Sequence, residues 1–333
     1  HRMNDFTPHA YRCDNYGAEC VDLSAGLPQD DYVKVIREDP KNPDVLYVGM
    51  EQGLQLSIDG GQSWHDLRLN LPRVSVRDIK IHPRENDLII GTHGRGAWIL
   101  DDIAPIQGLA DAMGDDLAVF DVRPTTRWER WSKDSNLGMS TWQGENPPTG
   151  AIINYYLVED AGPGGAAPAS AGDRGGRGGR GGRDGRGGGG GDGAVTITIT
   201  DADGVEVHEF RDRGRAGINR ALWNMSWANP PGMPAGGRGF RGGGGGLPAL
   251  PGTYTATVRA GSNEASSTFT LRGDPDVGLT MADYQAHFDA ALTVRDLTFS
   301  LAPRFRTVAA LSPQLNSVER PSLDASLHVL EST

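Results

Sequence analysis

The chain has 333 residues, and its 32 lysines and arginines stand against 43 aspartates and glutamates, which gives a formal net charge of −11. Its 47 glycines lack the strict three-residue period of collagen, and no stretch approaches the roughly 18 to 20 apolar residues of a membrane-spanning helix. At this length we expect two domains.

A repeat with an offset of about 43 residues opens the chain. Residues 33–49 read Val-Lys-Val-Ile-Arg-Glu-Asp-Pro and then Val-Leu-Tyr-Val-Gly, and 76–91 read Val-Arg-Asp-Ile-Lys-Ile-His-Pro and then Asp-Leu-Ile-Ile-Gly. A similar offset relates 21–28 to 65–72. A period in the low forties filled with short alternating strands is typical of four-stranded β-propeller blades.

An eight-residue motif lies within the repeat. Ser57-Ile-Asp-Gly-Gly-Gln-Ser-Trp64 fits the pattern Ser-x-Asp-x-Gly-x-Ser/Thr-Trp, known as the Asp box. We expect Asp59 and Ser63 to satisfy turn amides, Gly61 to adopt positive φ, and the tryptophan to pack beneath the turn. Asp59 is therefore interpreted as a turn-stabilising residue and not as a catalytic acid.

The two cysteines lie one repeat earlier. Shifting the box back by 44 residues places Cys13 at its Ser position and Cys20 at its Trp position, across the base of a hairpin. Our hypothesis is a Cys13–Cys20 disulfide that replaces the lost box side chains and indicates an oxidising compartment. The alternative is two unrelated buried thiols, and a Cα–Cα distance above about 7 Å would exclude the bridge.

With this repeat and box, the first 110 residues resemble the sortilin-like, BNR (Asp-box) β-propeller proteins of bacteria, which are often labelled glycosyl hydrolases. The resemblance is carried by 46–54 (Leu-Tyr-Val-Gly-Met-Glu-Gln-Gly-Leu), by the box, and by 91–102 (Gly-Thr-His-Gly-Arg-Gly-Ala-Trp-Ile-Leu-Asp-Asp). It implies that 1–110 are the last blades of a propeller whose upstream blades are missing. Because the chain begins at His1 without a signal-peptide pattern, we interpret it as a fragment or processed product.

The segment 91–102 contains the best polar cluster, His93 and Arg95 beside Trp98. This pair could present donors to an anionic or carbohydrate ligand. In the structural interpretation, which we favour, Arg95 pairs with Asp101 or Asp102 and His93 caps a blade turn. A glycosidase needs two placed carboxylates or, in the sialidase type, an arginine cluster with a Tyr/Glu nucleophile and an acid. Neither set can be assigned, so no catalytic residue, metal site or cofactor is predicted.

Residues 111–150 leave the repeat and are interpreted as an extended connector. Its tryptophans, which we expect to pack a domain junction, are Trp128, Trp131 and Trp142. From 151 to 273 the pattern is typical of an Ig-like or fibronectin-like β-sandwich. The predicted strands are 152–157, 195–200, 205–210, 217–225, 250–258 and 266–271. This part is similar to the Ig-like module that follows the propeller in the same bacterial family.

Two tracts, 161–193 and 235–246, contain 25 of the 47 glycines, and both fall between predicted sandwich strands. Their seven arginines and three aspartates leave −15 for the rest of the chain. Arg-Gly-Gly triplets in the first tract are similar to those of RNA-binding proteins, but interleaved aromatic residues are nearly absent. We therefore interpret the tracts as solvated loop insertions and do not expect nucleic-acid binding.

Residues 279–302 change to a helical period, and Thr280 with Asp283 offers a capping pair. The apolar face consists of Met281, Tyr284, Phe288, Ala291 and Leu292. Periodicity is lost after Pro303, and we expect 303–333 to be poorly ordered.

The sequence thus predicts an all-β chain, made of C-terminal propeller blades, an Ig-like sandwich and a terminal helix. Our first hypothesis for its function is a binding or scaffold module for a protein or carbohydrate ligand, secreted, periplasmic or associated with the cell envelope. The second is the C-terminal part of a BNR-repeat glycoside hydrolase, sialidase- or xyloglucanase-like, with its catalytic residues in the missing blades.

Overall fold

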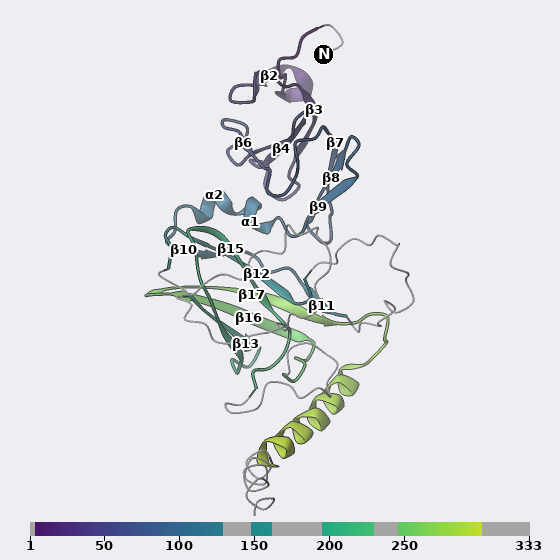
Figure 1. Ribbon diagram of the computed structural model, residues 1–333, viewed down its shortest axis with the longest axis vertical. Helices are drawn as coiled ribbons and strands as arrows, with labels where there is room; N and C mark the ends of the chain where they lie inside the picture. The colour runs from purple at the N-terminus through teal and green to yellow at the C-terminus, as the bar shows by residue number, and fades with distance from the viewer. Residues whose placement is uncertain (1–3, 129–147, 162–194, 230–245, 302–333) are drawn as a thin grey trace, which may run out of the picture. The chain divides into compact units, whose positions relative to one another are not determined.

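The computed structural model describes residues 4–128, 148–161, 195–229 and 246–301 (Figure 1). Most of the regular structure in these ranges is β-strand, so the chain is all-β with a few helices. It divides into two compact units, His1–Asn224 with Gly252–Arg272, and Met225–Pro251 with Gly273–Thr333. Each helix in the described ranges is too short or too polar to cross a membrane.

Three antiparallel sheets follow one another at the start of the first unit. A hairpin consists of β1 (Tyr11–Asp14), the short 3-10 turn η1 (Asn15–Gly17) and β2 (Glu19–Asp22). A four-stranded meander consists of β3 (Val33–Glu38), β4 (Leu46–Met50), β5 (Leu54–Ser57) and β6 (His65–Asp66). A three-stranded sheet consists of β7 (Val76–Ile81), β8 (Leu88–Thr92) and β9 (Ala97–Leu100).

The second and third of these sheets repeat each other in register as well as in sequence. The first residue of β3, Val33, pairs with the last residue of β4, Met50, and the register shifts before Val35. The first residue of β7, Val76, pairs with the last residue of β8, Thr92, and the register shifts in the same place, before Asp78. Each repeat therefore contains a β-bulge at the same position, with Lys34 or Arg77 as the extra residue.

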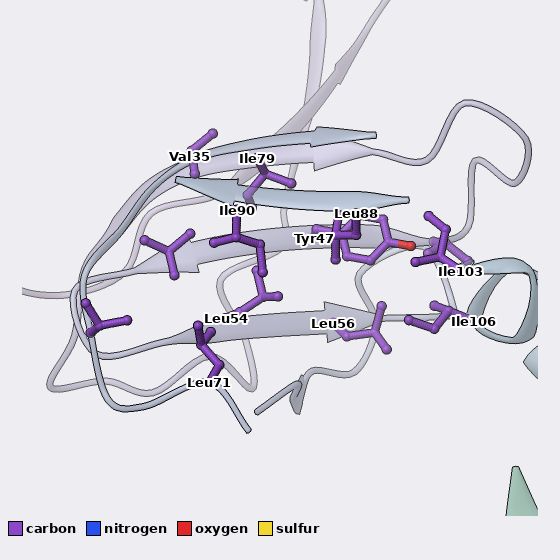
Figure 2. Close-up of a cluster of buried hydrophobic side chains, with 13 residues drawn as sticks. Val35, Tyr47, Leu54, Leu56, Leu71, Ile79, Leu88, Ile90, Ile103 and Ile106 are labelled. Atoms are coloured by element: carbon purple, nitrogen blue, oxygen red, sulfur yellow. The ribbon is translucent and has the colours of Figure 1, made fainter. Parts of the chain in front are cut away.

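Two apolar clusters form the core of this region, and strands β4 and β5 are buried along their whole length. One cluster packs the segments that flank the first hairpin against the four-stranded sheet through Leu23, Val48 and Trp64, whereas the hairpin strands themselves are exposed. The other fills the space between the two repeats (Figure 2), where Tyr47, Ile79 and neighbouring aliphatic side chains are buried. The repeats thus stabilise each other through a shared core.

Two further sheets follow the short helices α1 (Ala104–Gln107) and α2 (Leu109–Ala112). The first contains β10 (Leu117–Val119), β12 (Ala151–Leu157) and β15 (Gly217–Trp223). The second contains β11 (Thr125–Arg127), β17 (Asn263–Gly273), β16 (Gly252–Ala260), β13 (Val195–Asp201) and β14 (Glu206–Asp212), in that spatial order. Trp223 of the first sheet contacts Tyr254 and Phe269 of the second, with ring centroids 5.1 and 6.0 Å apart.

Part of the predicted connector belongs to these sheets. Residues 117–119 and 125–127 pair with β12 and β17 as the short strands β10 and β11. They do so because Leu117, Phe120 and Val122 are buried. The predicted junction residue Trp128 is half exposed. Trp131 and Trp142 lie outside the described residues, as do nearly all of the glycine tracts 161–193 and 235–246.

The second unit contains the C-terminal helix, which covers 281–301. Thr280 caps it: the Asp283 carboxylate accepts from the Thr280 amide and hydroxyl, and the Asp283 amide donates to the Thr280 hydroxyl. Of its predicted apolar face, Tyr284 is buried and Phe288 contacts Trp227, whereas Met281 is exposed. The tail 303–333 lies outside the described residues.

Candidate functional site

The Asp box forms a closed hydrogen-bonded turn. The Ser57 hydroxyl accepts from the Gly61 amide at 2.8 Å and donates to the Asp59 carboxylate at 2.7 Å. That carboxylate also accepts from the Ser63 amide and hydroxyl, at 2.9 and 2.5 Å. Gly61 has φ 89°, and the Trp64 indole donates to the Leu23 carbonyl at 2.9 Å.

These hydrogen bonds determine the pKa of Asp59. Partial burial raises its pKa, but the donors from Ser63 and Ser57 outweigh that effect and lower the pKa to about 2. Both oxygens of the carboxylate are occupied by the turn. The geometry gives Asp59 a structural role in this turn.

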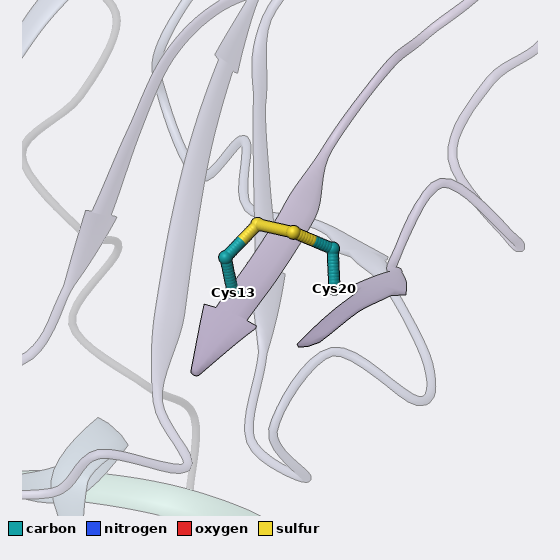
Figure 3. The surroundings of a disulfide bond; sticks show 2 residues. All are labelled: Cys13 and Cys20. Atoms are coloured by element: carbon teal, nitrogen blue, oxygen red, sulfur yellow. A yellow bond between two sulfur atoms is a disulfide. The ribbon is translucent and has the colours of Figure 1, made fainter. Parts of the chain in front are cut away.

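Cys13 and Cys20 are directly opposite each other in the β1–β2 hairpin and are joined by a disulfide (Figure 3). Their Cα atoms are 4.1 Å apart, well inside the limit for a bridge. Both residues are exposed. Strand β1 occupies the position of β5 one repeat earlier, so the disulfide lies where the next repeat has its Asp box.

His93 and Arg95 project from the tight turn between β8 and β9, and both are exposed. The turn is closed by the Thr92 amide, which donates to the Gly96 carbonyl at 3.1 Å. The half-buried Trp98 donates its indole N–H to the Arg95 carbonyl, also at 3.1 Å. The main chain of this turn is therefore fixed, and the side chains of His93 and Arg95 are exposed on it.

The expected ion pair of Arg95 does not occur in the structure. Asp101 offers its carbonyl to Arg220 at 2.9 Å, and the buried carboxylate of Asp102 accepts from Asn154 at 2.9 Å. Asp102 has φ 55°, and burial raises the pKa of both aspartates. The Asp102 carboxylate is thus engaged within the first unit, and neither aspartate pairs with Arg95 among the described residues.

A cluster that the sequence did not reveal lies beside this turn, and we call it the loop-end cluster: Tyr32, Lys34, Glu51 and Ser75. One carboxylate oxygen of Glu51, Oε2, receives all three other side chains. The Tyr32 hydroxyl donates to it at 3.1 Å, the Lys34 ammonium lies 2.9 Å away, and the Ser75 hydroxyl donates at 3.0 Å. The Lys34 ammonium also lies 3.9 Å from the centre of the Tyr32 ring.

The β-bulge explains why these residues meet. Tyr32 and Glu51 flank the first residue pair of β3 and β4, and the extra residue Lys34 is inserted in the bulge beside them. Ser75 precedes β7 at the matching place in the next repeat. A bulge redirects a side chain in a way that strand alternation does not predict, so the sequence pattern alone gave no sign of this cluster.

The cluster is ionised at neutral pH. Burial lowers the pKa of Lys34, but the bonds to Tyr32 and Glu51 outweigh it, so the pKa is raised. The Lys34 ammonium in turn lowers the pKa of Glu51. The Lys34 side chain is only 9% exposed, whereas the Glu51 side chain is 38% exposed.

Glu51 consequently has one oxygen to offer a ligand. Oε2 is occupied, and no donor from the described residues bonds Oε1. The neighbouring Asp31 is buried, and its two oxygens accept the amides of Tyr32, Glu51 and Gln52. The cluster therefore holds a fixed acceptor but not the two free carboxylates that a glycosidase needs.

The cluster and the turn are linked directly. The His93 amide donates to the Ser75 carbonyl at 2.9 Å, and the Ser75 hydroxyl reaches Glu51. His93 and Arg95 thus lie at the same end of the two repeats as the cluster. Within the described residues, no group of three or more His, Cys, Asp or Glu side chains could hold a metal ion.

Comparisons with known proteins assign no family. No protein-family model matches the chain, and no curated protein matches it. Among solved structures, it is similar to a "Biofilm associated protein - BSP domain", with 7% identity and a TM-score of 0.20 over 74% of this chain and 30% of that one. The chain spans less than a third of that protein's length, and so low a likeness carries no argument.

Proposed function

We propose that the chain is the ligand-binding C-terminal part of an exported sortilin-like protein. In this proposal 1–110 are the last blades of an Asp-box β-propeller and 151–273 are an Ig-like sandwich. Two sheets that share offset, register and bulge support the first part. Two sheets that meet at Trp223, Tyr254 and Phe269 support the second.

The observation that carries the binding role is the loop-end cluster. Three donors hold Glu51 in one orientation, so its free oxygen is preorganised to accept a hydroxyl group. His93 and Arg95 supply donors from the adjacent fixed turn. A fixed acceptor with neighbouring donors and an aromatic ring suits a carbohydrate ligand.

The disulfide supports an exported location. The Cys13–Cys20 bridge is exposed, and exposed disulfides persist in oxidising compartments such as the periplasm or the extracellular space. We therefore propose a secreted, periplasmic or envelope-associated protein.

A glycoside hydrolase is the second candidate, because the Tyr32 hydroxyl bonds Glu51 as a sialidase-type nucleophile pair would require. The Lys34 ammonium occupies the same carboxylate oxygen, however, and no second free carboxylate lies in the cluster. Release of reducing sugar from any glycan by the 333-residue chain, lost in Glu51→Gln, would favour this candidate over a binding module.

A glycan array followed by calorimetry tests the binding role. We expect the chain to retain glycans, and Glu51→Gln to weaken the strongest interaction about tenfold because it replaces the acceptor carboxylate. Glu85→Gln is the matched control, since Glu85 is 40% exposed and pairs with Arg84 at the other end of the second repeat. Failure to bind any glycan, or equal loss in both variants at unchanged melting temperature, would refute the proposal.

A further inference from the structure

We infer that the ligand is an anionic saccharide, bound by Arg77, His93 and Arg95 of the second repeat. This inference rests on the proposed binding function and adds the chemical class of the ligand. It comes from comparing the two bulges, which have the same register and different charges.

In the first repeat, the bulge cation is neutralised. Lys34 reaches the carboxylate of Glu51, the residue that follows the end of β4. In the second repeat, the bulge residue is Arg77, and the residue that follows the end of β8 is His93. The second repeat therefore places an imidazole where the first has a carboxylate, and Arg77 has no counter-charge at the equivalent position.

The side chains of Arg77, His93 and Arg95 are all exposed. In the part of the chain that the structure describes, none of Arg77, His93 and Arg95 forms an ion pair or a side-chain hydrogen bond. Neighbouring arginines behave differently, since Arg37 pairs with Asp78 and Arg84 pairs with Glu85. Uncompensated cations at one end of two repeats are notable in a chain of net charge −11.

The turn that carries His93 and Arg95 is also fixed. Gly94 and Gly96 have φ 82° and 70°, a conformation that favours glycine. The bond from Trp98 to the Arg95 carbonyl anchors the turn to the core. Arginine on a fixed main chain presents a planar fork that matches a carboxylate or a sulfate group.

The free oxygen of Glu51 completes the assignment. It would repel a bare anion, but it accepts a hydroxyl group, and it lies in the cluster that Ser75 joins to His93. A ligand that satisfies both features bears hydroxyl and anionic groups together. Saccharides with uronate or sulfate groups have this chemistry.

A glycan array carrying neutral, carboxylated and sulfated glycans tests the inference with the 333-residue chain. We expect retained glycans to be carboxylated or sulfated, and the two sets of spots distinguish which anion is bound. Binding should weaken steeply with added salt. Retention of neutral glycans as strongly as their anionic counterparts would overturn the inference and leave the proposed function standing, whereas retention of no glycan would overturn both.

Variants locate the anion site by calorimetry with the best array ligand. We expect Arg77→Gln and Arg95→Gln each to weaken binding about five- to tenfold, because each removes a charge-assisted hydrogen bond. Arg84→Gln removes the same charge from the far end of the β7–β8 hairpin and should change affinity less than about twofold. Equal effects of all three substitutions would show a nonspecific charge effect and refute the site.

Discussion

The two repeats of the first unit have the same strand arrangement and the same bulge, but the polar contacts at equivalent positions differ. Both have the bulge, both have a glycine near the end of the second strand, and both have an aspartate two residues after the third strand. The equivalent pairs are Lys34 and Arg77, Gly49 and Gly91, and Asp59 and Asp102. Each pair therefore allows the same residue type, or the same charge, to be compared in two different surroundings.

This comparison shows that strand register and polar side-chain contacts depend on different residues. Alternation and the shared core fix where each strand lies, whereas the polar partners depend on residues that the repeat does not preserve. Ser57 and Ser63 surround Asp59 in the first repeat, but Leu100 takes the place of Ser57 in the second. A substitution at equivalent positions should therefore give unequal effects.

The largest contrast in stability is expected between substitutions of the two glycines, Gly49 and Gly91. A Cβ added at Gly49 would lie 2.7 Å from methyl groups of Val35 and Val76, both of which belong to the core between the repeats. A Cβ at Gly91 would lie no closer than 3.7 Å to Asp78. We expect Gly49→Ala to lower the free energy of unfolding by about 3 kcal/mol through overpacking.

Gly91→Ala is the matched control and should cost less than about 1 kcal/mol. Urea unfolding followed by tryptophan fluorescence measures both values. Equal stability of the two variants would show that the repeats do not pack against each other as described.

The second-largest contrast in stability is expected between substitutions of the two aspartates, Asp59 and Asp102. Asp59→Asn removes a carboxylate that accepts four bonds within the box turn, and we expect it to cost about 2 kcal/mol at pH 7. Asp102→Asn removes a charge that burial disfavours and retains one oxygen, which can accept from either Asn154 or the Ala104 amide. It also suits the positive φ at this position, so it should be neutral or stabilising by up to about 1 kcal/mol.

The pH dependence of the two substitutions should have opposite signs. The pKa of Asp59 is lowered from 3.8 to about 2, so its contribution is complete above pH 3.8 and disappears as the pH falls toward 2. The pKa of Asp102 is raised, so the advantage of Asn is largest at neutral pH and fades as Asp102 becomes protonated. Urea unfolding at several pH values checks both trends, and parallel trends would contradict this assignment.

Much of the fold could be predicted from the sequence, because its elements follow local rules. The Asp box and the Thr280–Asp283 cap are patterns of a few consecutive residues, the repeat is a similarity between two segments of the chain, and strands such as β13 and β16 alternate visibly. The strands β10 and β11 were not predicted, because three residues are too few to show alternation. The loop-end cluster was not predicted either. Its residues Lys34, Glu51 and Ser75 come from two separate repeats, and a bulge brings them together.

The smallest contrast concerns the bulge residues themselves. Lys34 is nearly buried and bonds both Tyr32 and Glu51, so Lys34→Met leaves the Glu51 carboxylate without its counter-charge and should cost about 1 kcal/mol. Arg77 is exposed and unpaired among the described residues, so Arg77→Met should change the free energy of unfolding by less than about 0.5 kcal/mol. Urea unfolding at low and high salt separates the two variants, because only the Lys34→Met cost should shrink when salt screens the pair. A larger cost for Arg77→Met would mean that Arg77 has a structural partner, and the bulge of the second repeat would then have no free cation for a ligand.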